Sequence, residues 1–190
     1  MSRYSVHWDE LSALEVTPQE VAKHAEALSA AYNDPANAPL MGHTKPLSPA
    51  DVIDSYREGI KKGMRAFLLY QNGELVGDAD LRGVKAGRAE FAFMIAMPSA
   101  QGKGLGTRFA LMLHDFGFRE LELRRIYASV SPQNVASLRV FEKLGYVVDT
   151  SPAARAYADE PTDVTLSLER ETFERDQATA LSQIRIGERD

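Results

Sequence analysis

The sequence predicts a single mixed α/β (α+β) domain in which helices flank a central sheet. Two observations lead to this fold class. Stretches with apolar residues at helical spacing alternate with short runs of two-residue periodicity. An Asn-Gly pair at residues 72–73 joins two of those runs as a hairpin. No internal repeat and no linker divides the 190 residues, a length that suits one hydrophobic core.

Composition narrows the functional classes. Hydrophobic residues make up 44% and charged residues 26% of the chain, as in globular proteins generally. The net charge of −5 argues against broad nucleic-acid binding. The absence of cysteine excludes disulfides, thiolate catalysis and cysteine-based zinc sites. Because we find no signal-peptide pattern and no apolar run approaching 18 residues, we expect a cytoplasmic protein without membrane contact.

The first part of the chain is expected to hold one strand and two helices. Residues 11–16 form a weak strand. Thr17-Pro18-Gln19-Glu20 has the pattern of a capping box with proline at the first helical position. The helix that follows turns one face inward at spacings of i, i+4, i+7 and i+11: Val21, Ala25, Leu28 and Tyr32. After a loop over residues 33–45, Ser48-Pro49-Ala50-Asp51 starts a second helix. Its inward side chains are Ile53, Tyr56 and Ile60.

Three strands then form a meander. They cover residues 64–70, 74–81 and 89–96, and turns at 72–73 and 85–88 join them. In the third strand Phe91, Phe93 and Ile95 alternate with Glu90, Ala92 and Met94.

The last part of the chain predicts two more helices and three more strands. A helical stripe follows residue 104: Leu105, Phe109, Met112, Leu113 and Phe116. Residues 125–130 form a strand and residues 134–144 a helix, which Gly145 ends as a left-handed cap. Residues 146–149 and 164–168 are closing strands. We expect the domain to span residues 1–170, with residues 171–190 as a charged tail that is either a surface helix or a frayed end.

The most informative segment is Gln101-Gly-Lys-Gly-Leu-Gly-Thr107, which lies between a predicted strand and a predicted helix. Its glycines remove side chains where the first helical turn exposes amide N–H groups without internal partners. The helix dipole adds positive potential at that point, so the loop suits phosphate oxygens. A tight strand-to-helix turn without a ligand is the structural alternative.

Two nucleotide-binding motifs do not fit this segment. A phosphate-binding loop of the Walker type requires Gly-Lys-Ser/Thr, but Gly106 is followed by Thr107. A dinucleotide-binding fingerprint requires a third glycine three residues after Gly-x-Gly, where this chain has Phe109.

Residues 101–106 resemble the acyl-CoA pyrophosphate loop, Gln/Arg-x-x-Gly-x-Gly/Ala, of the GNAT superfamily of N-acetyltransferases. A second block, from Asn134 to Tyr146, resembles the Asn-x-x-Ser-x-x-x-x-Glu-Lys-x-Gly-Phe signature of its branch that acetylates ribosomal-protein N-termini, and of small-molecule relatives. The resemblance covers about residues 10–170. It implies a mixed, mostly antiparallel sheet that is splayed at the acyl-CoA site.

The resemblance also implies acetyl-CoA as co-substrate and direct transfer of its acetyl group to a primary amine. The amides of residues 102–107 would cradle the pyrophosphate, and the splayed strand would pair with the pantetheine arm and supply an oxyanion-stabilising N–H. The residues placed at the cofactor site are Met94, Ile95, Ala96, Gln101, Gly102, Lys103, Gly104, Leu105, Gly106, Thr107 and Asn134.

Two side chains are candidates for proton transfer. Many relatives carry a tyrosine that protonates the leaving thiolate, where this chain has Phe141. Ser137 is the nearest hydroxyl that the block supplies; the alternative is a hydrogen bond to the carbonyl one turn earlier. Glu90 is a candidate base for the amine, or an outward-facing strand residue. Asn134 is a helix N-cap, a contact to the cofactor arm, or both.

Other residues carry weaker expectations. His43 lies in a loop that lines the acceptor pocket in relatives, and Met41, Tyr56 and Trp8 are further candidates for the acceptor side. His114 is expected to be structural, and four scattered histidines predict no metal site. Two acidic groups are expected to be solvated surface, although either can attract a cationic acceptor: Asp78 with Asp80, and Asp159, Glu160 and Asp163.

The sequence therefore predicts an acetyl-CoA-dependent N-acetyltransferase acting on a small molecule or a protein N-terminus. The alternative is a catalytically silent module that binds acyl-CoA, which the missing tyrosine favours. Loss of one acid would slow the reaction without abolishing it, because thiolate is a good leaving group and proximity with an oxyanion hole supplies most of the rate. A homodimer is a further possibility, with the closing strands and the tail as contact surfaces.

Overall fold

The computed structural model describes residues 2–40 and 45–189, and within them one sheet of nine strands. The sheet order is β7-β8-β6-β5-β4-β3-β2-β1-β9. Neighbouring strands are antiparallel except for β5 and β6. The strands are β1 Arg3–Trp8, β2 Leu11–Glu15, β3 Arg65–Gln71, β4 Glu74–Lys85, β5 Arg88–Ile95, β6 Arg125–Val130, β7 Val147–Val148, β8 Val164–Glu169 and β9 Arg185–Arg189. The predicted mixed, mostly antiparallel sheet is confirmed.

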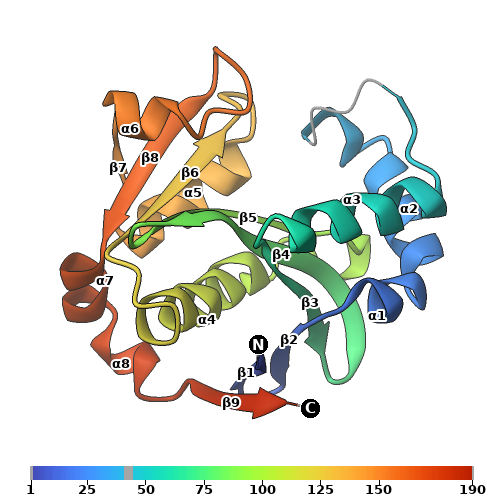
Figure 1. Ribbon diagram of the computed structural model, residues 1–190, viewed down its shortest axis with the longest axis horizontal. Coiled ribbons are helices and arrows are strands. Elements are labelled where there is room, and N and C mark those ends of the chain that lie inside the picture. Colours follow the sequence, from blue (N-terminus) through green and yellow to red (C-terminus); the bar gives the residue numbers. More distant parts are fainter. Residues whose placement is uncertain (1, 41–44, 190) are drawn as a thin grey trace.

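Helices cover both faces of this sheet (Figure 1). They are α1 Pro18–Ala22, α2 Ala25–Asn33, α3 Pro49–Lys61, α4 Leu105–Arg119, α5 Val135–Leu144, α6 Pro152–Arg155, α7 Arg170–Asp176 and α8 Ala178–Leu181, with 3₁₀ turns at η1 Ala38–Leu40 and η2 Pro98–Ala100. Strand β3 shows the two-sided packing: Phe67 and Leu69 belong to the core under α4, and Ala66 and Leu68 belong to the core under α1–α3. Such a strand buries both faces, so its apolar run is continuous.

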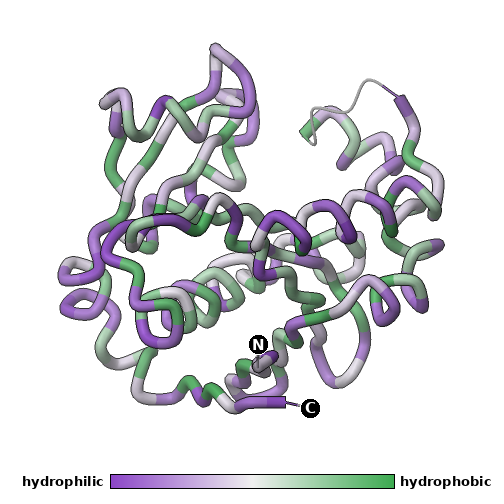
Figure 2. Tube along the Cα trace, viewed as in Figure 1, coloured by the Kyte–Doolittle hydropathy of each residue, from purple (hydrophilic) through white to green (hydrophobic). Residues whose placement is uncertain are grey.

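The two faces differ in how fully their helices are buried. Helix α4 is apolar over most of its surface, whereas α3 is largely hydrophilic outside one stripe (Figure 2). All five residues of the predicted α4 stripe are buried. In α3 the stripe is rotated from the prediction, because Val52 and Tyr56 are buried and Ile53 is only partly so.

One predicted helix is two helices. Thr17 and Glu20 form the expected capping box, but α1 ends at Ala22 and α2 begins at Ala25. His24 leaves helical geometry at the junction (φ −117°, ψ 2°), and its Nε2 lies 3.2 Å from the Tyr70 hydroxyl. The four predicted inward residues are nevertheless all buried, so the apolar spacing could not reveal the break.

Both ends of the described chain add strands that the sequence did not predict. Strand β1 pairs with β2 and with β9, so that Arg3 is opposite Arg189. Residues 170–181 form α7 and α8, and residues 185–189 form β9, an edge of the sheet. The residues expected as a surface helix or frayed end are thus helical first and then pair with the sheet. The predicted homodimer stays a prediction.

The sheet is splayed between β5 and β6, as the resemblance implied. These parallel strands pair at three positions, Arg88↔Arg125, Ala89↔Ile126 and Glu90↔Tyr127. Beyond Glu90, β5 stays paired with β4 as far as Gly77↔Ile95. One edge of β5 therefore has no strand partner from Phe91 to Ile95 within the described chain.

Gly77 allows β4 to approach β5 closely at the end of this splayed section. A Cβ on Gly77 would overlap the carbonyl oxygen of Met94. Just beyond, the Val76 carbonyl accepts hydrogen bonds from the N–H groups of both Ala96 (2.9 Å) and Met97 (3.2 Å). This double acceptance has the form of a bulge that ends the strand. None of the helices in the described ranges is long and apolar enough to cross a membrane.

Candidate active site

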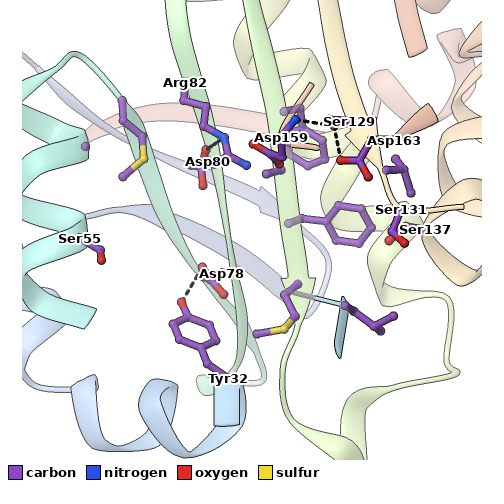
Figure 3. A pocket seen from close by; sticks show the side chains of 18 of the residues that line it. Tyr32, Ser55, Asp78, Asp80, Arg82, Ser129, Ser131, Ser137, Asp159 and Asp163 are labelled. Atoms are coloured by element: carbon purple, nitrogen blue, oxygen red, sulfur yellow. Dashed lines mark hydrogen bonds and ion pairs between the residues drawn. The ribbon is translucent and has the colours of Figure 1, made fainter. Parts of the chain in front are cut away.

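A cavity of about 1060 Å³ opens at the splay. Side chains from α2 and α3 form one wall, β4 and β5 form the floor, and α5 with the end of β6 and the loop at residues 159–163 forms the opposite wall. Figure 3 shows Tyr32 directed at Asp78 on one side of this space, with Asp159 and Asp163 on the other. The sheet opening thus brings together residues from distant parts of the sequence.

The glycine loop has the backbone of an anion cradle. Gly102 (φ +72°) and Gly104 (φ +76°) are both left-handed, and Gly104 caps α4 without any side-chain hydrogen bond. Residues 101–104 are exposed. The first-turn N–H groups of α4 are therefore open to an anion from outside.

Gly106 has a different role from the other two glycines of the loop. A Cβ at this position would lie 3.0 Å from Cε2 of Phe93 and 3.5 Å from Cγ2 of Val140. The residue thus lets α4 pack closely against β5 and α5. Leu105 beside it is buried in the core.

Gln101 connects this loop to the end of β5. Its Nε2 donates to the Ile95 carbonyl (2.8 Å) and to Oδ1 of Asn37 (3.1 Å), and Asn37 donates in turn to the Ala96 carbonyl (3.1 Å). Ala96 is fully buried and its N–H donates to Val76, so both its backbone groups have protein partners. Of the three residues predicted along the cofactor arm, Met94 lines the cavity.

Helix α5 presents Asn134, Ser137 and Phe141 to the cavity. Asn134 is an N-cap, because its Oδ1 accepts the Ser137 N–H (3.1 Å). The Ser137 hydroxyl makes no hydrogen bond within the described residues, so the alternative bond to the preceding turn is not formed. The Phe141 ring packs against Phe93, with centroids 5.9 Å apart.

Glu90 is neither an outward-facing residue nor part of the cavity lining. It is buried, and its Oε2 lies 3.3 Å from Nε of Arg82, its cross-strand partner. Burial raises the pKa of Glu90 to about 8 against the opposing charge of Arg82. The prediction that Glu90 acts as a base is not tested by this arrangement.

Asp78 and Asp80 are not the solvated surface residues that we expected. They lie with Arg82 at alternate positions on one face of β4 and line the cavity, and Oδ1 of each aspartate is buried without a hydrogen bond from a described residue. Burial raises the pKa of each carboxyl to about 6, opposed for Asp78 mainly by hydrogen bonds from tyrosine and for Asp80 by Arg82. In the sequence these three polar residues alternate with Gly77, Ala79 and Leu81, and this two-residue period is the signal that indicates a polar face.

Two tyrosines hold Asp78. The Tyr32 hydroxyl of α2 and the Tyr56 hydroxyl of α3 donate to its Oδ2, at 2.9 and 2.8 Å. Both rings are buried, and the two hydroxyl oxygens lie 3.3 Å apart. Tyr56 thus lines the cavity, and its expected role on the acceptor side stays a prediction.

The loop at residues 159–163 adds acidic groups to the opposite wall. Ser129 of β6 donates to Oδ2 of Asp163 (2.7 Å) and accepts the Asp159 N–H (3.1 Å), which fixes the loop over the cavity. Among the described residues, six acidic side chains and two basic ones line the cavity: Glu58, Asp78, Asp80, Asp159, Glu160 and Asp163 against Lys62 and Arg82. This lining favours a cation.

The remaining predicted residues lie elsewhere. Trp8 packs under Arg108, whose guanidinium carbon is 4.8 Å from its ring centroid, and does not line the cavity. His114 is buried, with Nδ1 2.6 Å from the Ala110 carbonyl and Nε2 2.5 Å from the Tyr146 hydroxyl, and burial lowers its pKa to about 3. Met41 and His43 lie outside the described residues. The described residues contain no group of three or more acidic or histidine side chains arranged to hold a metal ion.

The bare loop before α4, the splayed β5–β6 pair and the adjoining cavity are the features that the resemblance to acetyltransferases implied. The family model of the acetyltransferase (GNAT) domain matches residues 14–147. The chain belongs to this family.

Similarity to individual curated proteins covers a shorter part of the chain than the family match does. The spermidine N(1)-acetyltransferase of Escherichia coli (strain K12) is 37% identical over 87 residues, which are 45% of this chain and 46% of that protein. The aligned region therefore spans about half the length of this curated relative.

Solved structures share the fold at low identity. Aminoglycoside acetyltransferase AAC(6')-Ib in complex with coenzyme A gives a TM-score of 0.72 at 22% identity, over 88% of this chain and 99% of that one. The ribosomal-protein-S5-alanine acetyltransferase of Vibrio fischeri gives 0.70 at 15% identity, over 88% and 97%.

Proposed function

We propose that this chain transfers the acetyl group of acetyl-CoA to a primary amine of a small polycationic acceptor. The observation that carries the proposal is the acidic cavity beside the splayed edge of β5. An acceptor with several ammonium groups matches the six acidic and two basic side chains that line the cavity. Family membership and the spermidine acetyltransferase relative support the same class of reaction.

The residues present fit acetyl-CoA. The uncapped N–H groups at residues 102–107 suit its pyrophosphate, with the Lys103 side chain adding positive charge and Gln101 bracing the loop. The unpaired edge of β5 near Met94 and Ile95 offers backbone groups to the pantetheine arm. Ala96, whose backbone groups are hydrogen-bonded within the protein, holds the end of the strand in place. Bound there, acetyl-CoA supplies the activated thioester.

We propose Ser137 as the proton donor to the sulfur that leaves, because its free hydroxyl lines the cavity on the same wall as Asn134. Phe141 has no proton to give. A backbone N–H of the unpaired β5 edge would stabilise the oxyanion as the amine adds to the thioester carbonyl.

An acceptor panel tests the proposal. Coenzyme A release is measured with spermidine, an aminoglycoside, and peptides with free N-termini, each at several concentrations. We expect the polycationic small molecules to give at least tenfold higher kcat/KM than any peptide. Turnover confined to the peptides would instead support the branch that acetylates protein N-termini, which the block at residues 134–146 resembles.

Calorimetry with coenzyme A separates an enzyme from a silent module. Binding of coenzyme A without turnover of any amine would favour the silent acyl-CoA-binding module and overturn the proposal. A properly folded protein that binds neither coenzyme A nor acetyl-CoA would overturn the cofactor assignment itself.

A further inference from the structure

Asp78 has one carboxylate oxygen fully engaged and the other without a partner. Oδ2 accepts hydrogen bonds from both Tyr32 and Tyr56. Oδ1 is buried, and no described residue donates to it. Buried acceptors in native proteins are nearly always paired, so a donor beyond the described residues is expected at Oδ1.

Asp78 is also the carboxylate that lacks a cation. Arg82 lies between Asp80 and Glu90, with Nε 3.4 Å from Oδ1 of the first and 3.3 Å from Oε2 of the second. Within the described chain, no basic side chain lies at ion-pair distance from Asp78. A half-buried carboxylate without a counter-ion favours a bound ammonium group.

The position of Asp78 is the one that an attacking amine needs. Its register partner on β5 is Met94, within the section of β5 that has left β6. Asp78 and Met94 both line the cavity. An amine held by Asp78 is thus brought to the same section of strand that is proposed to hold the thioester.

We infer that Asp78 binds the acceptor ammonium through Oδ1 and accepts its proton, and that the Tyr32–Tyr56 pair orients the carboxylate for this role. The inference rests on the proposed acetyl transfer. The ammonium N–H bond breaks, an Oδ1–H bond forms and the electron pair stays on nitrogen. That pair attacks the thioester carbonyl carbon to form the C–N bond, and the C–S bond breaks as the oxyanion collapses. The second proton passes from nitrogen to the Ser137 oxygen as Ser137 gives its own proton to the departing sulfur, and Asp78 returns the first proton to water.

The residues that face Asp78 from each neighbouring element affect the pKa of its carboxyl. Tyr32 faces it from α2, Tyr56 from α3, and Asp80 and Arg82 from β4 itself; its register partners Leu68 of β3 and Met94 of β5 are uncharged. Burial raises the pKa of Asp78 to about 6, and the tyrosine hydrogen bonds hold it below what burial alone would give. The carboxylate is therefore mostly ionised at neutral pH, and activity should fall below pH 6.

The alternatives on the same sheet fit less well. Glu90 does not line the cavity and lies against Arg82, and Asp80 shares that guanidinium. Both side chains already lie against the guanidinium of Arg82. Among the described residues none forms an ion pair with Asp78, so we assign that place to the acceptor.

The test compares Asp78→Asn with Asp54→Asn, an exposed carboxylate-to-amide control on the outer side of α3. Steady-state rates are measured from pH 5 to 9 with the best acceptor of the panel. We expect Asp78→Asn to lower kcat about 10²- to 10⁴-fold and to remove the acidic limb near pH 6. Asp54→Asn should leave both unchanged. Thermal unfolding and coenzyme A calorimetry on the same samples check the fold.

Tyr32→Phe and Tyr56→Phe give an independent readout. Each removes one hydrogen bond to the ionised carboxylate, so the pKa of Asp78 rises and the acidic limb moves to higher pH. A merely structural role would change Tm without moving that limb.

Two results would overturn the inference: wild-type kcat in folded Asp78→Asn, whether or not its KM is raised, or an unmoved acidic limb in both tyrosine variants. A wild-type protein that turns over no amine would instead count against the proposed function on which the inference rests.

Discussion

Gly77 and Met94 touch so closely that a side chain at position 77 would occupy the space of the Met94 carbonyl oxygen. The contact lies on the β4 side of β5, in the section whose other edge has left β6 and is proposed to receive the pantetheine arm. The absence of a Cβ at Gly77 thus lets β4 and β5 pack closely in the section where β6 has separated from β5. This requirement leads to the first prediction.

Gly77→Ala should destabilise the protein and weaken coenzyme A binding, because β5 must move to admit the methyl group. Overpacking of this kind costs about 1–3 kcal/mol. The control is Gly187→Ala in β9, whose Cβ would meet only the Ser5 hydroxyl oxygen at 3.8 Å. Urea unfolding gives the free energy and calorimetry the affinity. Equal unfolding free energies of the two variants would show that β4 and β5 can accommodate a methyl group at position 77, and would contradict this prediction.

Gly104→Asp and Gly104→Asn should differ in affinity for coenzyme A. Asn and Asp both tolerate the left-handed backbone of this position better than other side chains do. They are nearly equal in size, so the added negative charge at the mouth of α4 is the main difference. We expect the Asp variant to bind about tenfold more weakly, which corresponds to ~1.4 kcal/mol. Matching affinities would refute the pyrophosphate assignment. Gly106 is unsuitable for this test because its substitution would displace Phe93.

Ser137→Ala should lower kcat more than it raises KM. The hydroxyl makes no hydrogen bond to another described residue, and Asn134 caps the helix through the Ser137 backbone, which the substitution keeps. A loss of about 10- to 100-fold is expected for one proton donor. Coenzyme A affinity, measured separately, should not change. If kcat stays at the wild-type value, the departing sulfur takes its proton from elsewhere.

Stability should decrease as the pH rises from about 5 to 8, because of Glu90. Its pKa is raised to about 8 in the folded protein from 4.5, so the native state binds a proton that the unfolded chain has already released. The unfolding free energy therefore falls with rising pH across this window. Glu90→Gln should flatten the decline, whereas Glu58→Gln, an exposed control, should retain it. Urea unfolding at pH 5, 6.5 and 8 measures the slopes; identical slopes in all three proteins would count against a protonated Glu90.

Much of the fold could be predicted because local patterns determine it. The capping box at Thr17, the turn at residues 72–73 and the left-handed Gly145 each fix their own neighbourhood. Strand β1 pairs with its neighbour β2 and with β9, and no local pattern could show the second pairing because β9 is distant in sequence. The break at His24 escaped prediction since the apolar face continues across it.

The site was only partly predictable for the same reason. The glycine loop and the start of α5 are contiguous motifs, and the structure sets them around one cavity. The Tyr32–Tyr56–Asp78 cluster combines three elements that no spacing connects. The acidic side chains of β4 resembled solvated surface because nothing local shows that α2 and α3 cover them.

Arg3 and Arg189 face each other across β1 and β9, and these two strands lie on the side of the molecule away from α3 and β6 (Figure 1). An affinity tag or a fluorescent label attached beyond β1 or β9 would lie away from the cavity proposed to bind the substrates. Fusions at these two points are therefore suited to immobilising the protein for single-turnover assays.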